Sequence, residues 1–227
     1  MSAPAPAWAP PGGRKSDRTR AAIVSAAMEL FRERGYDATT MRDIARSADL
    51  SLGCAYYYFR SKDELVAGCY GRLAVEHAAA AEPVLAVAED FERGLHGVLR
   101  CWLEIAEPFH PFAGRFFSVV AQPEAVLPGA DATEARDAGI GLYTRLVAGF
   151  APGGEPRLYP HLPELLWRYH LGVVLFWVHD RSPGLGRTSL LVDRTVPMVS
   201  RLIQLSRSRV LRPLSGRAAD LLGALRE

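Results

Sequence analysis

The chain has 227 residues, of which 49% are hydrophobic and 23% charged, and its formal net charge is only +2. These values are typical of a globular chain long enough for one large or two modest domains. They exclude a globally basic surface, so any nucleic-acid-binding surface must be local. The longest hydrophobic run, Leu171–Val178, is far shorter than the ~20 residues that cross a bilayer, and we predict no membrane association.

The three cysteines are widely spaced and form no Cys-x-x-Cys pair. We therefore predict neither a disulfide framework nor a zinc site, and a reducing, cytoplasmic location. Residues 1–13 are rich in proline, alanine and glycine and lack both a basic start and a continuous hydrophobic stretch. This pattern predicts a disordered tail rather than a signal peptide.

A basic leader, residues 14–20, runs into a predicted helix with hydrophobic residues at helical spacing. These residues are Ile23, Ala26, Ala27, Leu30 and Phe31. Gly35 is expected to end this helix, with Tyr36 packing back beneath it. The leader could contact DNA phosphates or could be solvated without a role.

Residues 39–62 contain three helix-start signals within a short stretch. Thr40 with Asp43 is an acidic variant of the capping box, and Ser61 with Glu64 is a full one. Between them, Asp49 is placed to end one helix and Ser51 to cap the next. The second helix is therefore only about two turns long and needs support from its neighbours.

Helical spacing places Ala55 and Phe59 on the inner face of this short helix, with Tyr57 packed beside them. Its outer face carries Leu52, Gly53, Cys54, Tyr56 and Tyr58, followed by Arg60 and Lys62. Two helices joined by a tight turn, the second displaying small and tyrosine side chains, are typical of a helix-turn-helix that enters the major groove. A short connecting helix with surface tyrosines is the alternative.

The remaining chain is predicted to be helical, with joints at proline and glycine. A helix from Ser61 is expected to stop at Pro83, and further helices are expected at 84–107, 110–121, 130–150, 161–180, 187–207 and 214–225. No strand-like alternation longer than four residues occurs, so we predict an all-α protein.

Two late helices are candidates for a dimer interface. The segment Glu164–Val178 is hydrophobic nearly all round, which predicts burial on every side. The helix at 187–207 is also hydrophobic, and Pro197 should kink it. We predict a homodimer through the helices near 161–180 and 187–207; a buried core hairpin in a monomer is the alternative.

No catalytic, nucleotide-binding or metal-binding motif is found, and no two histidines have the i, i+4 spacing of a helical metal site. We therefore predict no enzymatic activity, no cofactor and no metal. Aromatic residues of the second half could line a mostly hydrophobic effector pocket with a few polar anchors, or could simply fill the core. The candidate pocket residues are Trp102, His110, Phe116, Phe117, Gln122, Tyr143 and His170.

The run from Arg20 to Cys69 closely resembles the DNA-binding domain of the TetR/AcrR family of transcriptional regulators. Its motifs are Ala-Ala-x-Glu-Leu-Phe-x-Glu-Arg-Gly-Tyr and, further on, Leu-Ser-x-Gly-x-x-Tyr-Tyr-Tyr-Phe-x-Ser-Lys-x-Glu-Leu. The resemblance implies a three-helix DNA-binding domain at 14–72 and a helical effector-binding and dimerisation domain at 73–227.

The resemblance also implies roles for individual residues. Leu52, Gly53 and Cys54 would lie closest to base edges, and Tyr56 and Tyr58 match positions that contact the DNA backbone or bases. Thr40, Arg42 and Lys62 carry groups that suit phosphate oxygens. Two positions depart from the family pattern, because Tyr58 stands where histidine is frequent and Ala55 where a larger aliphatic residue is common.

Together these observations predict a homodimeric transcriptional repressor that binds a double-stranded DNA operator and is released by a small, largely apolar effector. The alternative is a helical small-molecule carrier or enzyme in which the N-terminal unit is an accessory.

Overall fold

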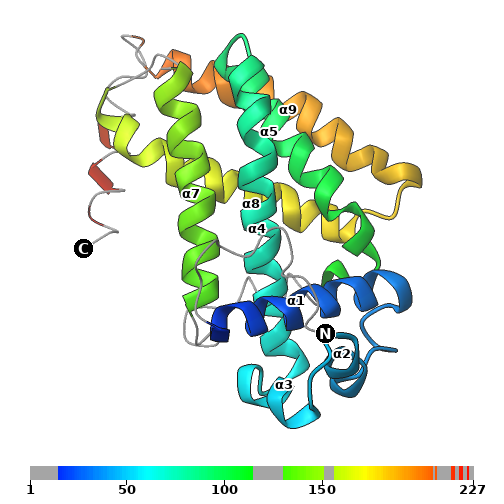
Figure 1. Ribbon diagram of the computed structural model, residues 1–227. Coiled ribbons are helices and arrows are strands. Elements are labelled where there is room, and N and C mark those ends of the chain that lie inside the picture. Colours follow the sequence, from blue (N-terminus) through cyan, green and yellow to red (C-terminus); the bar gives the residue numbers. More distant parts are fainter. Residues whose placement is uncertain are drawn as a thin grey trace. The chain divides into compact units, whose positions relative to one another are not determined.

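The computed structural model describes residues 15–114, 130–150 and 156–206, with a few single positions beyond them. Every regular element in these residues is a helix (Figure 1), which confirms the all-α prediction. None of the described helices is long and hydrophobic enough to cross a membrane. The tail predicted for residues 1–13 lies outside the described residues, as does most of the helix predicted at 214–225.

The chain divides into two compact units. The first comprises Met1–Leu73 and Ala106–Ala135, and the second comprises Ala74–Ile105 and Arg136–Glu227. One long helix, α4 (Lys62–Val87), contributes its first half to the first unit and its second half to the second.

The first unit is built from α1 (Lys15–Arg34), α2 (Met41–Ser47), α3 (Leu52–Tyr58), the start of α4 and the 3₁₀ helix η1 (Glu107–Phe112). Figure 1 shows α2 and α3 joined by a short turn, with α1 beside α2. The hydrophobic side chains expected at the inner face of α1 are buried, and they share a core with residues of α2, α3 and α4. Fully buried members are Ile23, Ala27, Phe31, Ile44, Ala55, Phe59, Leu65, Val66 and Cys69.

The end of α1 follows the sequence prediction. Gly35 adopts a left-handed conformation with φ +80°, which glycine tolerates without strain. Tyr36 is buried and packs against Phe31, with ring centroids 5.3 Å apart. This contact fixes the direction in which the chain leaves α1 toward α2.

The second unit contains the rest of α4, then α5 (Phe91–Ala106), α7 (Ala130–Phe150), α8 (Leu162–His179) and α9 (Gly186–Leu205). Short 3₁₀ helices η2 (Pro156–His161) and η3 (Pro183–Leu185) precede α8 and α9. The helices pack closely: a Cβ on Gly94 of α5 would lie 2.7 Å from Leu146 of α7. Glycine at this position therefore lets α5 and α7 approach.

Two predicted helix boundaries are wrong. The helix expected to stop at Pro83 continues to Val87, because proline inside a helix removes one hydrogen bond without ending the helix when packing supports it. The helix expected at 84–107 begins instead at Phe91, where Asp90 accepts a hydrogen bond of 2.8 Å from the Arg93 amide. Of the helix expected at 110–121, residues through Phe112 form a 3₁₀ helix, Ala113 and Gly114 are α-helical, and the residues from 115 on lie outside the described part.

The turn between α8 and α9 is built around one carboxylate. Asp180, only 4% exposed, accepts hydrogen bonds from the amide and hydroxyl of Ser182 (2.9 and 2.7 Å) and from the amide and hydroxyl of Thr188 (2.8 and 2.7 Å). Burial alone would raise the pKa of Asp180, but these hydrogen bonds outweigh it and hold the pKa far below its ordinary value. The ionised carboxylate therefore ties the end of α8 to the first turn of α9.

Candidate nucleic-acid interface

The start of α2 is fixed by the capping box predicted from the sequence. The Asp43 amide donates to the Thr40 hydroxyl oxygen (3.2 Å), and Asp43 accepts from the Thr40 amide (3.1 Å) and hydroxyl (2.5 Å). The side-chain and backbone hydrogen bonds from Thr40 lower the pKa of Asp43. A phosphate at Thr40 would therefore lie beside an ionised carboxylate, and the phosphate contact of Thr40 stays a prediction.

The turn between α2 and α3 also forms as expected. Asp49 adopts a left-handed conformation with φ 55°, which aspartate tolerates better than most residues. The Leu50 amide then donates to the Ala45 carbonyl (2.9 Å), and Ser51 caps α3 by accepting from the Cys54 amide (3.1 Å). These bonds set the angle at which α3 leaves α2.

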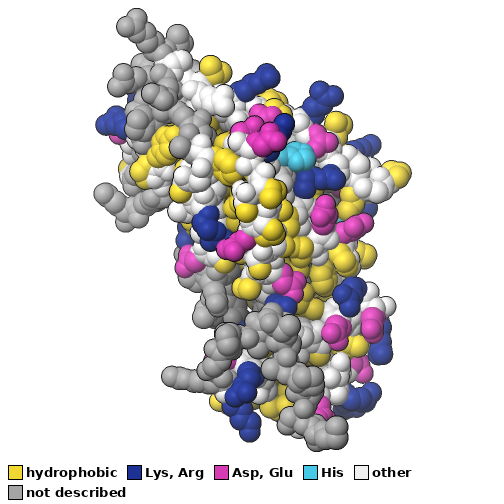
Figure 2. Space-filling view, turned by 45° about the horizontal axis from the view of Figure 1, so that its top comes forward, with side chains coloured by type: hydrophobic (Ala, Val, Ile, Leu, Met, Phe, Trp, Pro, Cys, Tyr) yellow, Lys and Arg dark blue, Asp and Glu magenta, His cyan; other side chains and the backbone are white. Residues whose placement is uncertain are grey.

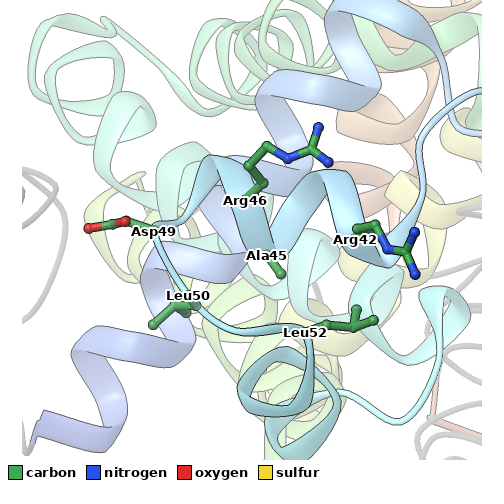
Figure 3. Close-up of a pocket in the computed structure, with 6 residues that line it drawn as sticks. All are labelled: Arg42, Ala45, Arg46, Asp49, Leu50 and Leu52. Carbon is green, nitrogen blue, oxygen red and sulfur yellow. The ribbon is translucent and has the colours of Figure 1, made fainter.

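A surface hollow of about 300 Å³ lies where α2 meets this turn. Figure 3 shows Arg42 and Arg46 on successive turns of α2, with Leu50 and Leu52 on the segment that follows. Ala45 and Asp49 complete the lining. Arg46, which the sequence analysis did not select, is highly exposed and lies 3.8 Å from Asp43. The hollow is thus lined by two basic residues and one acidic residue.

The outer face of α3 is close to the prediction except at one residue. Ala55 and Phe59 point inward and are fully buried, Gly53 and Tyr56 are exposed, and Leu52, Cys54 and Tyr58 are half-buried. Tyr57 was predicted to pack inward and is 82% exposed, so that prediction is wrong. Its side chain lies about 160° around the helix from both inward residues.

Lys62 is tied to the protein itself. Its ammonium group donates to the carbonyl oxygens of Tyr36 (2.7 Å) and Thr39 (2.9 Å) and lies 4.0 Å from the centre of the Tyr36 ring. The Tyr36 hydroxyl donates to Asp63 (2.7 Å), so three hydrogen bonds and one cation–ring contact join the α1–α2 loop to the start of α4. Lys62 is half-buried, and its phosphate contact stays a prediction.

Ser61 caps the start of α4 as predicted, because the Glu64 amide donates to the Ser61 hydroxyl oxygen (3.0 Å). The reciprocal bond of the capping box differs from the prediction, since the Glu64 carboxylate accepts from the amide of Arg60 (2.6 Å), one residue before Ser61. At this same end of α3, the Arg20 guanidinium lies 4.6 Å from the centre of the Phe59 ring. Together with the Ser51 cap at its start, these contacts hold both ends of α3.

Of the predicted effector residues, three come together in the core of the second unit. The Tyr143 hydroxyl is 2.8 Å from Nδ1 of His170, and the Trp102 ring lies edge-on to His170 with centroids 5.2 Å apart. The sequence analysis missed two further members, His77 and Trp177. The His77 ring lies 5.4 Å from His170, and the Trp177 ring 5.0 Å from Trp102. We call these five residues the aromatic cluster.

Both histidines of the aromatic cluster are held neutral. Nε2 of His77 donates to the Val98 carbonyl (2.9 Å), since a carbonyl oxygen can only accept. Burial lowers the pKa of His77, and burial together with the neighbouring His77 lowers the pKa of His170 well below its ordinary value. A sequence signal for His77 existed, because Leu73, His77 and Ala81 follow i, i+4 spacing along the buried face of α4.

The other predicted effector residues are not in this cluster. His110 is half-buried in η1 of the first unit. Phe116, Phe117 and Gln122 lie outside the described residues. Within the described residues, no three His, Cys, Asp or Glu side chains are grouped in a way that could hold a metal ion.

On the face in Figure 2, basic and acidic side chains of the described residues are interspersed with hydrophobic ones. The helices and caps of the first unit define a class of protein: an all-helical chain with a helix-turn-helix whose second helix is capped, anchored and exposed on one face.

Comparison with known families identifies the class more closely. The family model for bacterial regulatory proteins of the tetR family matches residues 23–69, and that for the tetracyclin repressor-like C-terminal domain matches residues 94–221. The chain therefore belongs to the TetR family of helix-turn-helix transcriptional regulators, as its sequence motifs implied.

Individual relatives agree with this family. The chain is 46% identical over 50 residues to the HTH-type transcriptional regulator HbdR of Aromatoleum sp. (strain CIB), a match covering 22% of each chain. It is 36% identical over 124 residues to the HTH-type transcriptional repressor Rv3405c of Mycobacterium tuberculosis, covering 53% of this chain and 64% of that protein. The matched stretches thus span less than two thirds of these relatives' lengths. The relatives point to a non-enzymatic regulator.

Solved structures share the fold. A TetR-family transcriptional regulator from Pectobacterium atrosepticum superposes with a TM-score of 0.62 at 20% sequence identity. The match covers 84% of this chain and 97% of that one. At this identity the likeness concerns the fold alone.

Proposed function

We propose that this protein is a homodimeric repressor that binds a pseudo-palindromic operator and leaves it when a small, largely apolar effector binds the second unit. The observation that carries the proposal is the exposed outer face of α3, held by the Ser51 cap at one end and by Phe59 at the other. Leu52, Gly53 and Cys54 would approach base edges, while Arg42 at the rim of the hollow would hold a phosphate.

Glycine at position 53 supports close approach to DNA. A Cβ built on Gly53 would meet no atom within 4 Å, so the space above it is open to a partner. The half-buried Cys54 and Leu52 flank it with short side chains. Leu52 could meet a thymine methyl group, which is the contact that an aliphatic side chain makes in the major groove.

Exposed hydrophobic side chains on α8 and α9 support the dimer. In the single chain Leu175 is 43% and Phe176 41% exposed on α8. On α9 the exposed hydrophobic residues are Leu190, Met198, Leu202 and Leu205. A second copy that covered these residues would form a four-helix interface, and two copies of α3 would then meet two operator half-sites.

The aromatic cluster supports a mostly uncharged effector. Three of its five side chains are Trp or Tyr, its two histidines are neutral, and burial and the neighbouring His77 lower the pKa of His170. A hydrophobic molecule with one or two hydrogen-bonding groups suits such surroundings. His77 lies on α4, the helix that begins next to α3, so an effector that moved His77 would move α4.

Operator binding tests the proposal directly. Selection from random duplexes with the purified protein should recover a sequence with two-fold symmetry. Tyr56→Ala should then abolish the gel shift on that sequence while sedimentation still gives a dimer, because Tyr56 is exposed on α3 and far in sequence from α8 and α9. An unchanged gel shift for Tyr56→Ala would reject the assigned DNA face. Failure of the wild-type protein to enrich any duplex would reject DNA binding itself.

A further inference from the structure

His77 is a buried polar side chain in mostly aromatic surroundings. It lies on α4, is 4% exposed, and belongs to the second unit, as do the other four residues of the aromatic cluster. No member of the cluster carries a carboxylate, an ammonium or a guanidinium group. A polar atom in such surroundings is stable only when a hydrogen-bonding partner reaches it. The hydrogen bonds that His77 makes therefore define what a ligand must supply.

The bond to Val98 fixes the position of the ring proton of His77. Nε2 lies 2.9 Å from the Val98 carbonyl oxygen, which can only accept, so Nε2 carries the proton. The ring is neutral, because burial lowers its pKa. Nδ1 of His77 therefore presents a lone pair, which accepts a hydrogen bond and cannot donate one.

No described residue donates a hydrogen bond to this lone pair. Within the described part of the chain, the bond to Val98 is the one hydrogen bond of His77. The His170 ring lies 5.4 Å away at an interplanar angle of 82°, and its own Nδ1 is 2.8 Å from the Tyr143 hydroxyl. Tyr143 and His170 thus bond to each other, and Nδ1 of His77 is left for a partner from outside the chain.

The lone pair selects the polar group of that partner. An uncharged hydroxyl donates its O–H to such a nitrogen, whereas a carboxylate, a ketone or an ether has no proton to donate. A primary amine is charged at neutral pH, and the five cluster residues offer no opposite charge to pair with it. The Trp102 and Trp177 rings beside His170 suit a flat hydrophobic body.

We propose that the effector is an uncharged, hydroxyl-bearing hydrophobic molecule, an alcohol or a phenol, whose O–H donates to Nδ1 of His77. The inference rests on the proposed function, since it takes the aromatic cluster as the effector site. It adds the chemical class of the effector, and it makes His77 the residue that distinguishes this class from ethers and acids of the same shape.

The test compares ligands of one shape on the wild-type protein, by isothermal titration calorimetry without DNA. The ligands are para-butylphenol, its methyl ether para-butylanisole, and para-butylbenzoate. We expect the phenol to bind about tenfold more tightly than the ether, because the ether leaves the lone pair without a donor. The benzoate should bind about a hundredfold more weakly than the phenol, because its carboxylate must lose its hydration and then meets a lone pair.

Variants of His77 separate the hydrogen bond from packing. His77→Phe keeps a ring without an acceptor, so it should bind the phenol and the ether equally. His77→Asn supplies an acceptor oxygen close to the backbone and should regain part of the preference for the phenol. Tyr169→Phe is the control, because it removes a hydroxyl of α8 that bonds to Thr195 (2.6 Å) outside the cluster. It should keep the full preference, and thermal melting by circular dichroism shows which variants are folded.

Equal affinity of the wild-type protein for the phenol and the ether would overturn the assignment, and this comparison requires no variant. Tighter binding of the benzoate, or no binding of any of the three ligands, would overturn it too. A preference for the phenol that persisted in folded His77→Phe would assign the O–H to another acceptor and refute the role of His77.

Operator release, measured separately by fluorescence anisotropy, keeps this assignment distinct from the proposed function. A phenol that showed the expected preference and still left the operator complex intact would confirm the ligand class and refute effector-controlled release. An ether that bound as tightly as the phenol and released the operator would support the proposed function and overturn the assignment to His77.

Discussion

The carboxylate of Asp180 allows a quantitative test of what holds α8 and α9 together. Asp180→Asn keeps the size of the side chain but replaces one acceptor oxygen by an NH₂ group. In the native turn one oxygen accepts both bonds from Ser182 and the other accepts both from Thr188. The single oxygen of the asparagine side chain can accept only one of these two pairs of hydrogen bonds.

The cost follows from the burial of the pair that is lost. If the amide oxygen keeps Ser182, the Thr188 hydroxyl can rotate to accept from the NH₂ group, but the Thr188 amide keeps its N–H and loses its acceptor. Thr188 is buried, and a buried unpaired donor costs about 1–3 kcal/mol. We expect Asp180→Asn to lower the free energy of unfolding by about 2 kcal/mol, which for a chain of this length is about 4–8 °C in Tm.

Urea unfolding followed by circular dichroism measures this loss, and two variants control for it. Thr188→Val removes the hydroxyl donor and keeps the amide bond, so it should cost about half as much. Asp193→Asn changes an exposed aspartate and should stay within about 0.5 kcal/mol of wild type. A wild-type unfolding midpoint for Asp180→Asn would refute the view that these four hydrogen bonds stabilise the turn.

Two further predictions concern the second unit: the pH dependence of its stability and the effect of a charged substitution on the dimer. Because burial lowers the pKa of both His77 and His170, the unfolded chain binds more protons than the folded chain below about pH 6.5, so the free energy of unfolding should fall as the pH is lowered through that value. His170→Gln should reduce this pH dependence in urea titrations, whereas a free energy of unfolding that stays level would contradict the neutral pair. Phe176→Arg should raise the dimer dissociation constant at least tenfold in sedimentation experiments, because it places a charge in a hydrophobic interface. Val87→Arg, at a hydrophobic residue that is even more exposed but lies outside the proposed interface, should leave the dimer unchanged. Equal effects of both variants would argue against the α8–α9 interface.

Features set by neighbouring residues were predictable from the sequence. The capping boxes of Thr40 and Ser61, the cap at Ser51 and the left-handed Gly35 each depend on a few adjacent residues. These local signals placed the helix-turn-helix, because its helices are short and each begins and ends at a recognisable residue.

Features set by packing were not predictable in the same way. Pro83 was taken as a stop, yet the helix continues because Ala81 is buried against the core of the second unit. Tyr57 was predicted to pack beside Ala55 and Phe59, although its angle on α3 opposes theirs and its side chain is exposed. Asp90 is a typical N-cap residue, but the helical pattern continues on both sides of it, so the sequence analysis did not place a helix start there.

The candidate effector site was also predictable only in part. Aromatic composition pointed to Trp102, Tyr143 and His170, which do meet. The contribution of His77 depends on α4 bringing a residue far away in sequence to the same place. No spacing rule relates residues so distant in the chain. Only the helical periodicity of α4 could have indicated that His77 is buried.

The uninterrupted course of α4 has a mechanical consequence. From Lys62, bound to the loop that precedes α2, to His77 in the aromatic cluster, the chain is one stretch of helix about 22 Å long. Pro83 lies beyond this stretch, so the hydrogen-bond ladder between the two side chains contains no proline gap. This part of α4 therefore lacks the residue type that most often bends a helix.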